Sequence, residues 1–476
     1  MRTVVVGHGM AGARLVEDLR ALDPDAAITV FGAEPDPPYN RILLSDLLAG
    51  RAAVDDLVLG GPSDVDIRSG VAACAIDRAG KVVTGSDGSQ APYDTLVLAT
   101  GSDPLLPPID GLRVDLPGVE VFRTLADCRR IMARPTGRAL VLGGGLLGLE
   151  SARGLAGRGI EVTVVHAAPF LMERQLDLAA GQVLARTLRQ LGIQTWVDAA
   201  TVRVLGEDRF RGLLLADGRE LHAELLVVSC GVRPNTGLAR AAGLAVGRGI
   251  VVDETMRSVT DGSIYAVGEC AEYAGQVHGL VAPSWEQAAV AAARISGVDP
   301  AARYLGSKLV TRLKAAGIEL AAMGDTQVAD DAGDDGPEVV SFIDPTRGTY
   351  KKVVIRDGRL VGAILLGDVS TVGTVTQLYD REGALPPDRL GLLFTGLAGQ
   401  GPPPDPMSLP DRATVCQCNS VSKSAIAACV LAGARTVADV AAGTRAGTGC
   451  GTCRDTVAAL VQGLSTCDAE PAVATA

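Results

Sequence analysis

Two glycine-rich turns constrain the fold of this chain more than any other feature of its sequence. The first, GHGMAG at residues 7–12, follows an apolar run at 3–6 and precedes a predicted helix over 13–22. The second, GGGLLG at residues 143–148, lies between an apolar run and a helix in the same way. A strand, a glycine turn and a helix in this order are typical of dinucleotide-binding units. Two such units, 136 residues apart, predict an α/β fold with two Rossmann-like dinucleotide-binding domains.

Each turn is expected to hold the pyrophosphate of one dinucleotide. Glycines let the backbone approach the phosphates, and the N–H groups and dipole at a helix N-terminus favour anions. After the first turn, a predicted strand over residues 27–31 leads to Glu34, where an acid can accept hydrogen bonds from an adenosine ribose. Glycines also serve as purely structural turns, but the strand and helix around both copies favour the binding interpretation.

Four cysteines near the end of the sequence form two pairs, Cys416 with Cys418 and Cys450 with Cys453. Four thiolates are the ligand set of a 2Fe–2S cluster. Structural zinc is the alternative, but zinc ligand pairs usually have two to four residues between them, and only one lies between Cys416 and Cys418. The spacing therefore predicts a 2Fe–2S cluster.

The other cysteines occur singly and are interpreted as ordinary thiols. They are Cys74, Cys128, Cys230, Cys270, Cys429 and Cys467. Enzymes that reduce disulfides need a redox-active pair of cysteines. Because no such pair occurs before residue 400, disulfide reductase chemistry is not expected.

The charge of the chain excludes several classes of partner. Lys and Arg number 44 against 55 Asp and Glu, a net charge of −11, whereas nucleic acids and anionic membranes need a basic surface. No apolar stretch has the length of a signal peptide or a membrane span. Together with the clustered cysteines, this predicts a cytoplasmic protein without a nucleic-acid or membrane partner.

Three stretches resemble the flavin-binding segments of two-dinucleotide flavoprotein reductases. They are residues 4–12, TLVLATG at 95–101 and TDGSIYAVGE at 260–269. The PYNR segment at 38–41, with Ser45, resembles the rubredoxin and ferredoxin reductase branch, where it lines the flavin.

Further segments resemble a narrower group over nearly the whole chain. GGGLLGLE, YAVGECAEY and HGLVAP are similar to the flavin half of NAD(P)H-dependent assimilatory nitrite reductases and to the electron-transfer subunits of assimilatory nitrate reductases. GVRPN at 231–235 matches the turn that ends the second nucleotide domain of the reductases. The cysteine segment resembles the bacterioferritin-associated ferredoxin (BFD) fold.

The resemblance implies binding residues for FAD, for NAD(P)H and for the cluster, and no catalytic residue, because hydride transfer is the chemistry of the cofactors. The residues expected at FAD are Gly7, Gly9, Met10, Ala11, Gly12, Glu34, Arg41, Ser45, Thr100, Gly101, Gly268, Glu269 and Trp285. The residues expected at NAD(P)H are Gly143, Gly145, Leu146, Leu147, Gly148, Glu150, His166, Arg174 and Gly231. The expected cluster ligands are Cys416, Cys418, Cys450 and Cys453.

Three of these assignments have an alternative. His166 stands where an NADH site usually has an acid, and with Arg174 nearby it leaves the choice between NADH and NADPH open; it is equally interpreted as a surface histidine. Trp285 lies against the isoalloxazine or in the core. Glu150 lies near the nicotinamide or on an exposed helix face.

The expected domains follow these motifs. They are a discontinuous FAD-binding domain at 1–113 and 246–302, an NAD(P)-binding domain at 114–245, a small α+β interface domain at 303–398, a proline-rich linker at 399–413, a small helical 2Fe–2S domain at 414–465 and a tail at 466–476. An acidic segment over 330–338 is predicted to be a solvated loop.

The expected function is to pass electrons from NAD(P)H through FAD and the 2Fe–2S cluster to a separate acceptor protein. The nitrite reductases resembled here continue into a sirohaem domain, and no further cysteine group precedes Ala476, so nitrite reduction by this chain itself is not expected. The catalytic subunit of assimilatory nitrate reductase is the first expected acceptor, and a nitrite reductase the second. A ferredoxin- or rubredoxin-type reductase for another acceptor, and a non-enzymatic iron-handling or redox-sensing module, are the alternatives. A homo-oligomer remains open.

Overall fold

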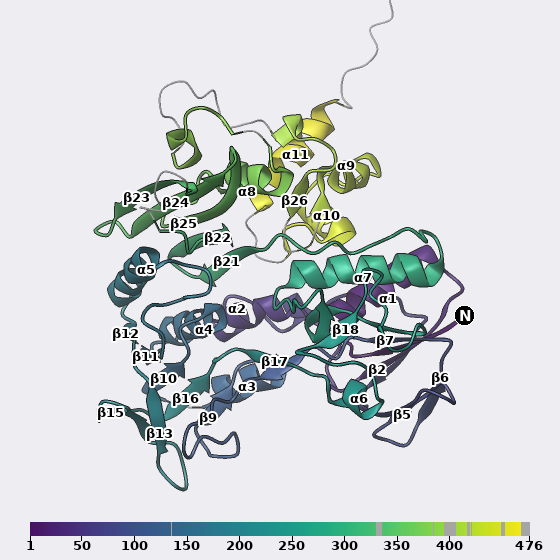
Figure 1. Cartoon of the computed structure of the whole chain (residues 1–476), viewed down its shortest axis with the longest axis horizontal. Coiled ribbons are helices and arrows are strands. Elements are labelled where there is room, and N and C mark those ends of the chain that lie inside the picture. The colour runs from purple at the N-terminus through teal and green to yellow at the C-terminus, as the bar shows by residue number, and fades with distance from the viewer. Residues whose placement is uncertain are drawn as a thin grey trace, which may run out of the picture.

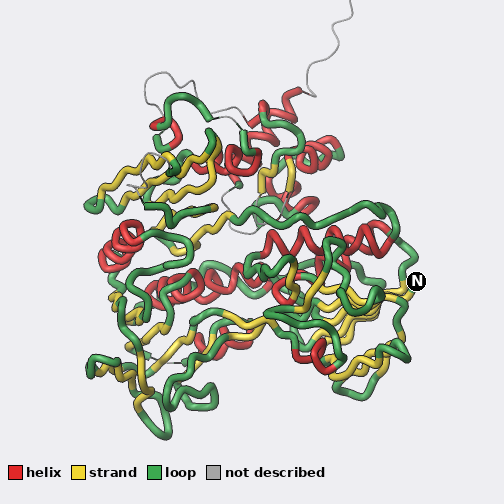
Figure 2. The backbone as a smooth tube through the Cα atoms, in the orientation of Figure 1, coloured by secondary structure: helices red, strands yellow, loops and turns green. Residues whose placement is uncertain are grey.

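Two five-stranded parallel sheets built on the same plan form the larger part of the protein, as the computed structural model shows (Figures 1 and 2). The structure describes residues 1–134, 136–329, 336–383, 385–394, 406–416, 419, 421–448 and 453–467. The first sheet has the order β19-β7-β1-β2-β3, with β1 (Arg2–Val6), β2 (Ala27–Gly32), β3 (Asp66–Ser69), β7 (Thr95–Leu98) and β19 (Ile264–Ala266). The second has the order β12-β11-β10-β16-β9, with β9 (Val119–Val121), β10 (Arg138–Leu142), β11 (Glu161–Val165), β12 (Gln194–Trp196) and β16 (Leu225–Val228).

Both central strands are continuous apolar runs because helices cover both faces of a parallel sheet. Residues 4–6 of β1 and 139–142 of β10 are buried throughout. The helix after each glycine turn is α1 (Met10–Leu22) or α4 (Leu146–Gly157), and α7 (Val281–Ser296) packs on α1. The sequence predicts the first helix from residue 13; it begins three residues earlier, at Met10, because Gly9 is its extended N-cap.

Each unit also carries a three-stranded antiparallel sheet. The first comprises β4 (Ala73–Asp77), β5 (Val82–Gly85) and β6 (Gln90–Pro92), and the second β13 (Thr201–Leu205), β14 (Gly212–Leu215) and β15 (Glu220–His222). An antiparallel pair, β8 (Ser102–Pro104) with β17 (Val232–Pro234), joins the two units. The remaining elements here are α2 (Leu44–Leu48), α3 (Leu125–Ala133), α6 (Gly237–Ala241), β18 (Ile250–Val252) and β20 (Ala271–Tyr273).

A third unit, an antiparallel sheet with one helix, packs on the second nucleotide unit. Its order is β21-β22-β25-β24-β23, with β21 (Val310–Ala315), β22 (Ile318–Gly324), β23 (Glu338–Asp344), β24 (Thr349–Arg356) and β25 (Arg359–Leu366), followed by α8 (Val372–Arg381). The neighbouring lysines 351 and 352 of β24 are both buried. Lys352 Nζ donates to Asp177, the N-cap of α5 (Leu178–Gln190), at 2.8 Å, whereas Lys351 Nζ donates to Asp368 and to the Leu393 carbonyl. Consecutive strand residues point to opposite faces, so each lysine holds a different neighbour.

The C-terminal unit is small and helical, and it lies beside α1 and α7 in Figure 1. It contains β26 (Thr414–Cys416), β27 (Val421–Ser422), α9 (Lys423–Leu431), α10 (Val437–Thr444) and α11 (Arg454–Cys467), which share one apolar core. Lys423 Nζ donates to the carbonyls of Met407 and Leu409 at 2.7 Å each, which fixes the incoming chain to α9.

Several expectations fall outside the described residues. These are most of the acidic segment (330–335), the first part of the proline-rich linker (399–405), Cys418, Cys450 and the end of the tail (468–476). In the part of the chain that the structure describes, no helix is long and apolar enough to cross a membrane.

Candidate cofactor-binding and electron-transfer site

One cavity of about 700 Å³ is lined both by the first glycine turn and by the start of α4, the helix that follows the second glycine turn. The first turn contributes Gly7, Gly9 and the start of α1, and the second contributes the start of α4. Residues 308–310 of the interface domain close a further side. The N-termini of two helices therefore point into the same space, as two dinucleotides that exchange a hydride require.

In the second turn, two of the glycines are needed for packing and one leaves space. Gly143 has a φ of +117°, and a Cβ there would lie 2.3 Å from the Ser229 carbonyl oxygen. A Cβ on Gly148 would lie 2.0 Å from the carbonyl oxygen of Gly143. A Cβ on Gly145 would meet no atom within 4 Å, so this face of the turn is open to a ligand.

The first turn repeats this arrangement. A Cβ on Gly7 would lie 2.1 Å from the Ala99 carbonyl oxygen, and one on Gly12 would lie 2.0 Å from that of Gly7. A Cβ on Gly9 would meet only the Arg41 guanidinium, at 3.8 Å. Both turns therefore fit a pyrophosphate that approaches the middle glycine.

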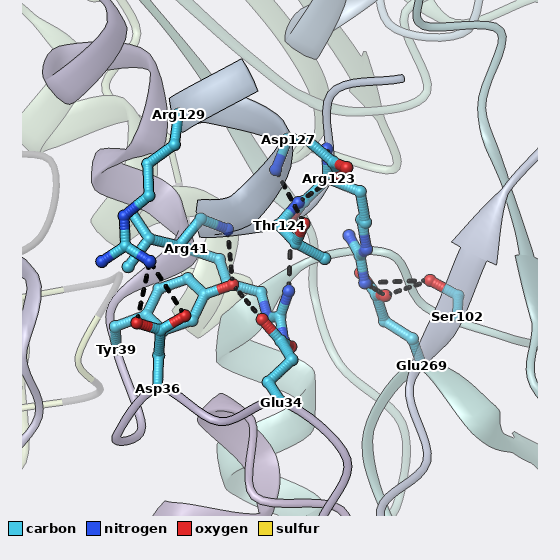
Figure 3. A network of polar contacts seen from close by, with 11 residues as sticks. Glu34, Asp36, Tyr39, Arg41, Ser102, Arg123, Thr124, Asp127, Arg129 and Glu269 are labelled. Carbon is cyan, nitrogen blue, oxygen red and sulfur yellow. Dashed lines mark hydrogen bonds and ion pairs between the residues drawn. The ribbon is translucent and has the colours of Figure 1, made fainter. Parts of the chain in front are cut away.

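Glu34, expected at an adenosine ribose, lies on the cavity wall beside Arg41, as Figure 3 shows. The Arg41 guanidinium forms an ion pair with one carboxylate oxygen, and Tyr39 Oη donates to the other at 2.7 Å. Tyr39 Oη in turn accepts from the Leu125 amide at 2.9 Å, and burial raises the pKa of this phenol. The Leu125 amide thus fixes the Tyr39 hydroxyl, and this hydroxyl orients the Glu34 carboxylate by donating a hydrogen bond to it.

Glu269, the acid expected at the flavin, forms a second polar group on the cavity wall (Figure 3). Ser102 Oγ and Arg123 Nη2 both donate to one of its carboxylate oxygens. Sequence reasoning missed Arg123. A signal for its placement existed, because Thr124 and Asp127 form a capping box that starts α3 directly after it.

Other expected FAD residues lie on or near this wall. Thr100, Gly101 and Gly268 line the cavity. Thr100 Oγ1 donates to the Asn235 carbonyl at 2.6 Å, which connects the wall to the second unit. Ser45 is buried, and its Oγ has no hydrogen-bond partner among the described residues.

Trp285 is placed in the core. It is 2% exposed, and its neighbours Ser284 and Glu286 line the cavity while Trp285 does not. The Arg14 guanidinium lies 5.6 Å from the ring centre. Because adjacent residues of a helix point in different directions, this placement favours the core interpretation over a flavin contact.

The residues expected at NAD(P)H divide into two groups. Leu146, Leu147 and Glu150 line the shared cavity. Arg174 is exposed, and Gly231 lies in the connection between the units, where its carbonyl accepts from the Leu105 amide at 2.9 Å.

His166 lies against the second glycine turn with both ring nitrogens engaged. The Gly144 amide donates to Nδ1 at 3.1 Å, and Nε2 lies 3.0 Å from Glu173 Oε2. Glu173 was not expected from the sequence. Its position, seven residues after His166, gave no signal.

Two of the single cysteines are largely buried thiols of low reactivity. Burial raises the pKa values of the Cys128 and Cys230 thiols to about 11. Of the described residues that line the cavity, none is a cysteine.

In the C-terminal unit, two of the four expected cluster ligands are described. Cys416 ends β26 and Cys453 immediately precedes α11, and both are buried in the same core. The buried Asn419 donates through Nδ2 to the Arg445 carbonyl at 2.6 Å and to Thr448 Oγ1 at 3.2 Å. Asn419 follows Cys418 and Thr448 precedes Cys450 by two residues, so this amide holds the two cysteine segments together. The two described thiols agree with the ligand type of a 2Fe–2S cluster, which is held by cysteine thiolates.

The same segment contacts a residue directly beside the cavity wall. Asn40 Nδ2 donates to the Thr448 carbonyl at 3.5 Å, and Asn40 precedes the cavity-lining Arg41. Arg445 forms an ion pair with Glu17 of α1. The expected cluster segment is therefore held beside the expected flavin site.

Comparisons with known proteins agree with this geometry. The family model described as Pyridine nucleotide-disulphide oxidoreductase matches residues 1–294. The Rubredoxin NAD+ reductase C-terminal domain matches residues 310–382, and the BFD-like 2Fe-2S binding domain matches residues 414–462. These matches confirm the resemblance inferred from the motifs.

Similar proteins extend over nearly the whole chain. A nitrite reductase (NAD(P)H) of Bacillus subtilis is 38% identical over 96% of this chain, and an assimilatory nitrate reductase electron transfer subunit of the same organism is 37% identical over 97%. The chain spans 57% and 59% of the length of these two relatives. A covalent putidaredoxin reductase–putidaredoxin complex is a structural neighbour, with a TM-score of 0.71 and 26% identity over 80% of this chain and 93% of that chain. The neighbour confirms the predicted fold class.

Proposed function

The chain belongs to the pyridine nucleotide-disulphide oxidoreductase family, and we propose that it is an NAD(P)H-dependent FAD-containing reductase that delivers electrons through a 2Fe–2S cluster to an assimilatory nitrate reductase or nitrite reductase. One observation carries this proposal: the first glycine turn and the start of α4 line the same cavity, and the cluster-bearing unit contacts Asn40, the chain neighbour of the cavity-lining Tyr39 and Arg41.

The residues of the first unit would hold FAD. Gly9 leaves space for its pyrophosphate at the start of α1, and Glu34, oriented by Tyr39, would accept from its adenosine ribose. Glu269, held by Ser102 and Arg123, would meet the flavin end of the same molecule.

The second unit would present NAD(P)H from the opposite side of the cavity. Gly145 leaves the space for its pyrophosphate, while Leu146, Leu147 and Glu150 face the flavin region. When bound, FAD converts a hydride into single electrons and a 2Fe–2S cluster carries one electron at a time. The task of the chain is to orient both groups and to exclude water between them.

The C-terminal unit would pass the electrons outward. Asn419 holds the two cysteine segments together, and Asn40 holds one of them beside the cavity. The similarity to a nitrite reductase and to a nitrate reductase electron transfer subunit supports assimilatory nitrate or nitrite reduction as the reaction that consumes the electrons. We place the acceptor centre on a separate catalytic protein.

An anaerobic titration tests this function. The purified chain should contain one FAD, two iron atoms and two sulfides, the iron and sulfide of one 2Fe–2S cluster. NADH or NADPH should bleach the flavin and then produce the electron paramagnetic resonance signal of a reduced cluster. Mixing the reduced protein with a nitrate reductase catalytic subunit and nitrate, or with a sirohaem nitrite reductase and nitrite, should reoxidise it and yield nitrite or ammonium, respectively.

Two outcomes would contradict the proposal. A cluster that NADH and NADPH leave oxidised, although the flavin is reduced, would favour the redox-sensing alternative. One equivalent of zinc without iron, after anaerobic purification, would show that the cysteines hold zinc, which cannot carry electrons to an acceptor.

A further inference from the structure

We propose that Glu173, and not a residue at the strand end, is the acid that recognises the adenosine ribose of the nicotinamide cofactor and disfavours the 2′-phosphate of NADPH. This inference rests on the proposed function of the second glycine turn, and it names the residue that sets its specificity.

Both ring nitrogens of His166, the residue after β11, already have polar partners. His166 follows β11, where an acid would accept from the ribose. Its Nδ1 accepts from the Gly144 amide at 3.1 Å, so in the neutral ring the hydrogen lies on Nε2 and is donated to Glu173 at 3.0 Å. Neither ring nitrogen is left to bind a ribose hydroxyl. The imidazole instead binds the Glu173 carboxylate, which lies on the far side of the ring from the glycine turn.

The backbone before Glu173 is fixed to the glycine turn. The Met172 amide donates to the Gly144 carbonyl at 3.0 Å, and Met172 is fully buried. Its φ of +54° is unusual for a residue with a side chain and persists only where the surroundings determine it. Its own carbonyl accepts from the amides of Gln175 and Leu176 at 2.8 and 2.9 Å. The turn at Met172 therefore fixes the backbone of Glu173 beside the second glycine turn, where the pyrophosphate is expected.

A residue of the third unit, Gln327, also binds the turn that carries Glu173. Gln327 Nε2 donates to the carbonyls of Glu173 and Leu176, at 3.2 and 2.5 Å. The turn then ends at Asp177, which Lys352 and Tyr350 bind. Three segments far apart in the sequence thus position one exposed carboxylate.

The carboxylate can accept more than its contact with His166. That contact uses Oε2, and the Glu173 side chain is 35% exposed. An ionised carboxylate has about four acceptor positions, enough for two ribose hydroxyls in addition to the imidazole. A 2′-phosphate in the same place would meet a like charge. With Gln at residue 173 the like charge disappears, and the exposed Arg174 would attract the phosphate.

The test compares Glu173→Gln with Glu220→Gln in the full-length flavoprotein. Glu220 is a matched control because it also pairs with a histidine, His222 at 3.5 Å, in the same nucleotide unit but far from the glycine turn in the sequence. Calorimetric titration with NAD+ and NADP+ gives the ratio of their dissociation constants. We expect E173Q to shift this ratio toward NADP+ at least tenfold, and E220Q to change it less than twofold. Glu173→Asp, which keeps the charge, should weaken NAD+ binding and still reject NADP+.

An unchanged ratio in E173Q, with flavin content and melting temperature intact, would overturn the inference while leaving the proposed function in place. If E173Q fails to fold, the E173D ratio decides: preference for NADP+ in that variant overturns the inference. If the parent chain binds neither nucleotide, both the inference and the proposed function are wrong.

Discussion

Replacing Gly145 with alanine should weaken nucleotide binding with little effect on stability, whereas replacing Gly148 with alanine should mainly lower the stability of the fold. Gly145 is the extended N-cap of α4, with a φ of −83°, and a Cβ there meets no atom within 4 Å. The stability of Gly145→Ala should therefore change by no more than about 1 kcal/mol. The methyl group instead takes the space through which a pyrophosphate reaches the backbone N–H groups. Losing one hydrogen bond to a charged group costs about 1.5–3 kcal/mol, roughly 10- to 150-fold in Kd.

Gly148→Ala acts on the folded chain itself. Its Cβ would lie 2.0 Å from the Gly143 carbonyl oxygen, which belongs to the backbone and cannot rotate away. Overpacking of this kind costs about 3 kcal/mol, at the upper end of the usual range. At about 2–4 °C for each kcal/mol, the melting temperature should fall by roughly 6–12 °C.

Circular dichroism melting and calorimetric titration with NAD+ and NADP+ separate the two effects. The reasoning fails if Gly145→Ala binds the nucleotides as tightly as the parent, because the phosphates then do not pass over this glycine. It also fails if Gly148→Ala melts at the parent temperature.

Three further outcomes are expected. Cys453→Ser should remove the cluster and leave flavin content and NAD(P)H-driven dye reduction unchanged, as iron analysis and visible spectra would show; loss of FAD in this variant would contradict a modular chain. Glu17→Gln should remove the partly exposed ion pair with Arg445, worth up to about 1 kcal/mol, and slow cluster reduction up to about fivefold in stopped-flow traces while dye reduction keeps its rate; equal rates would show that the pair does not hold the units together. The Cys128 and Cys230 thiols have pKa values of about 11, and a thiolate forms only as the pH rises toward the pKa, so at pH 8 about one in a thousand is ionised. Mass spectrometry after iodoacetamide treatment of the folded protein should therefore find the exposed Cys74 modified and these two intact, and rapid modification of either would show that its site opens.

The sequence predicted those features whose physical cause is local. Both glycine turns, the strands before them and the start of the cysteine-bearing unit depend on residues within about ten positions. Glu34 and Arg41 are also close in the sequence, and the structure pairs them on the cavity wall.

The contacts that complete the site join distant segments and gave no local pattern. Arg123 reaches Glu269, 146 residues away, and Asn40 reaches Thr448 across 408 residues. Trp285 illustrates a choice that the sequence left open, because the alternatives of a flavin contact and a core position depend on the rotation of the helix. Its ring packs beside Arg14 of α1.

The two buried lysines of β24 have a mechanical consequence. Lys352 holds the N-terminus of α5, and Lys351, on the other face of the strand, holds the Leu393 carbonyl and lies over the Phe394 ring at 4.7 Å. Those two residues lie shortly before the proline-rich segment that leads to the C-terminal unit. Two consecutive residues of one strand therefore anchor both the N-terminus of α5 and residues 393–394, so the nucleotide-binding unit and the segment before the proline-rich stretch share one point of attachment.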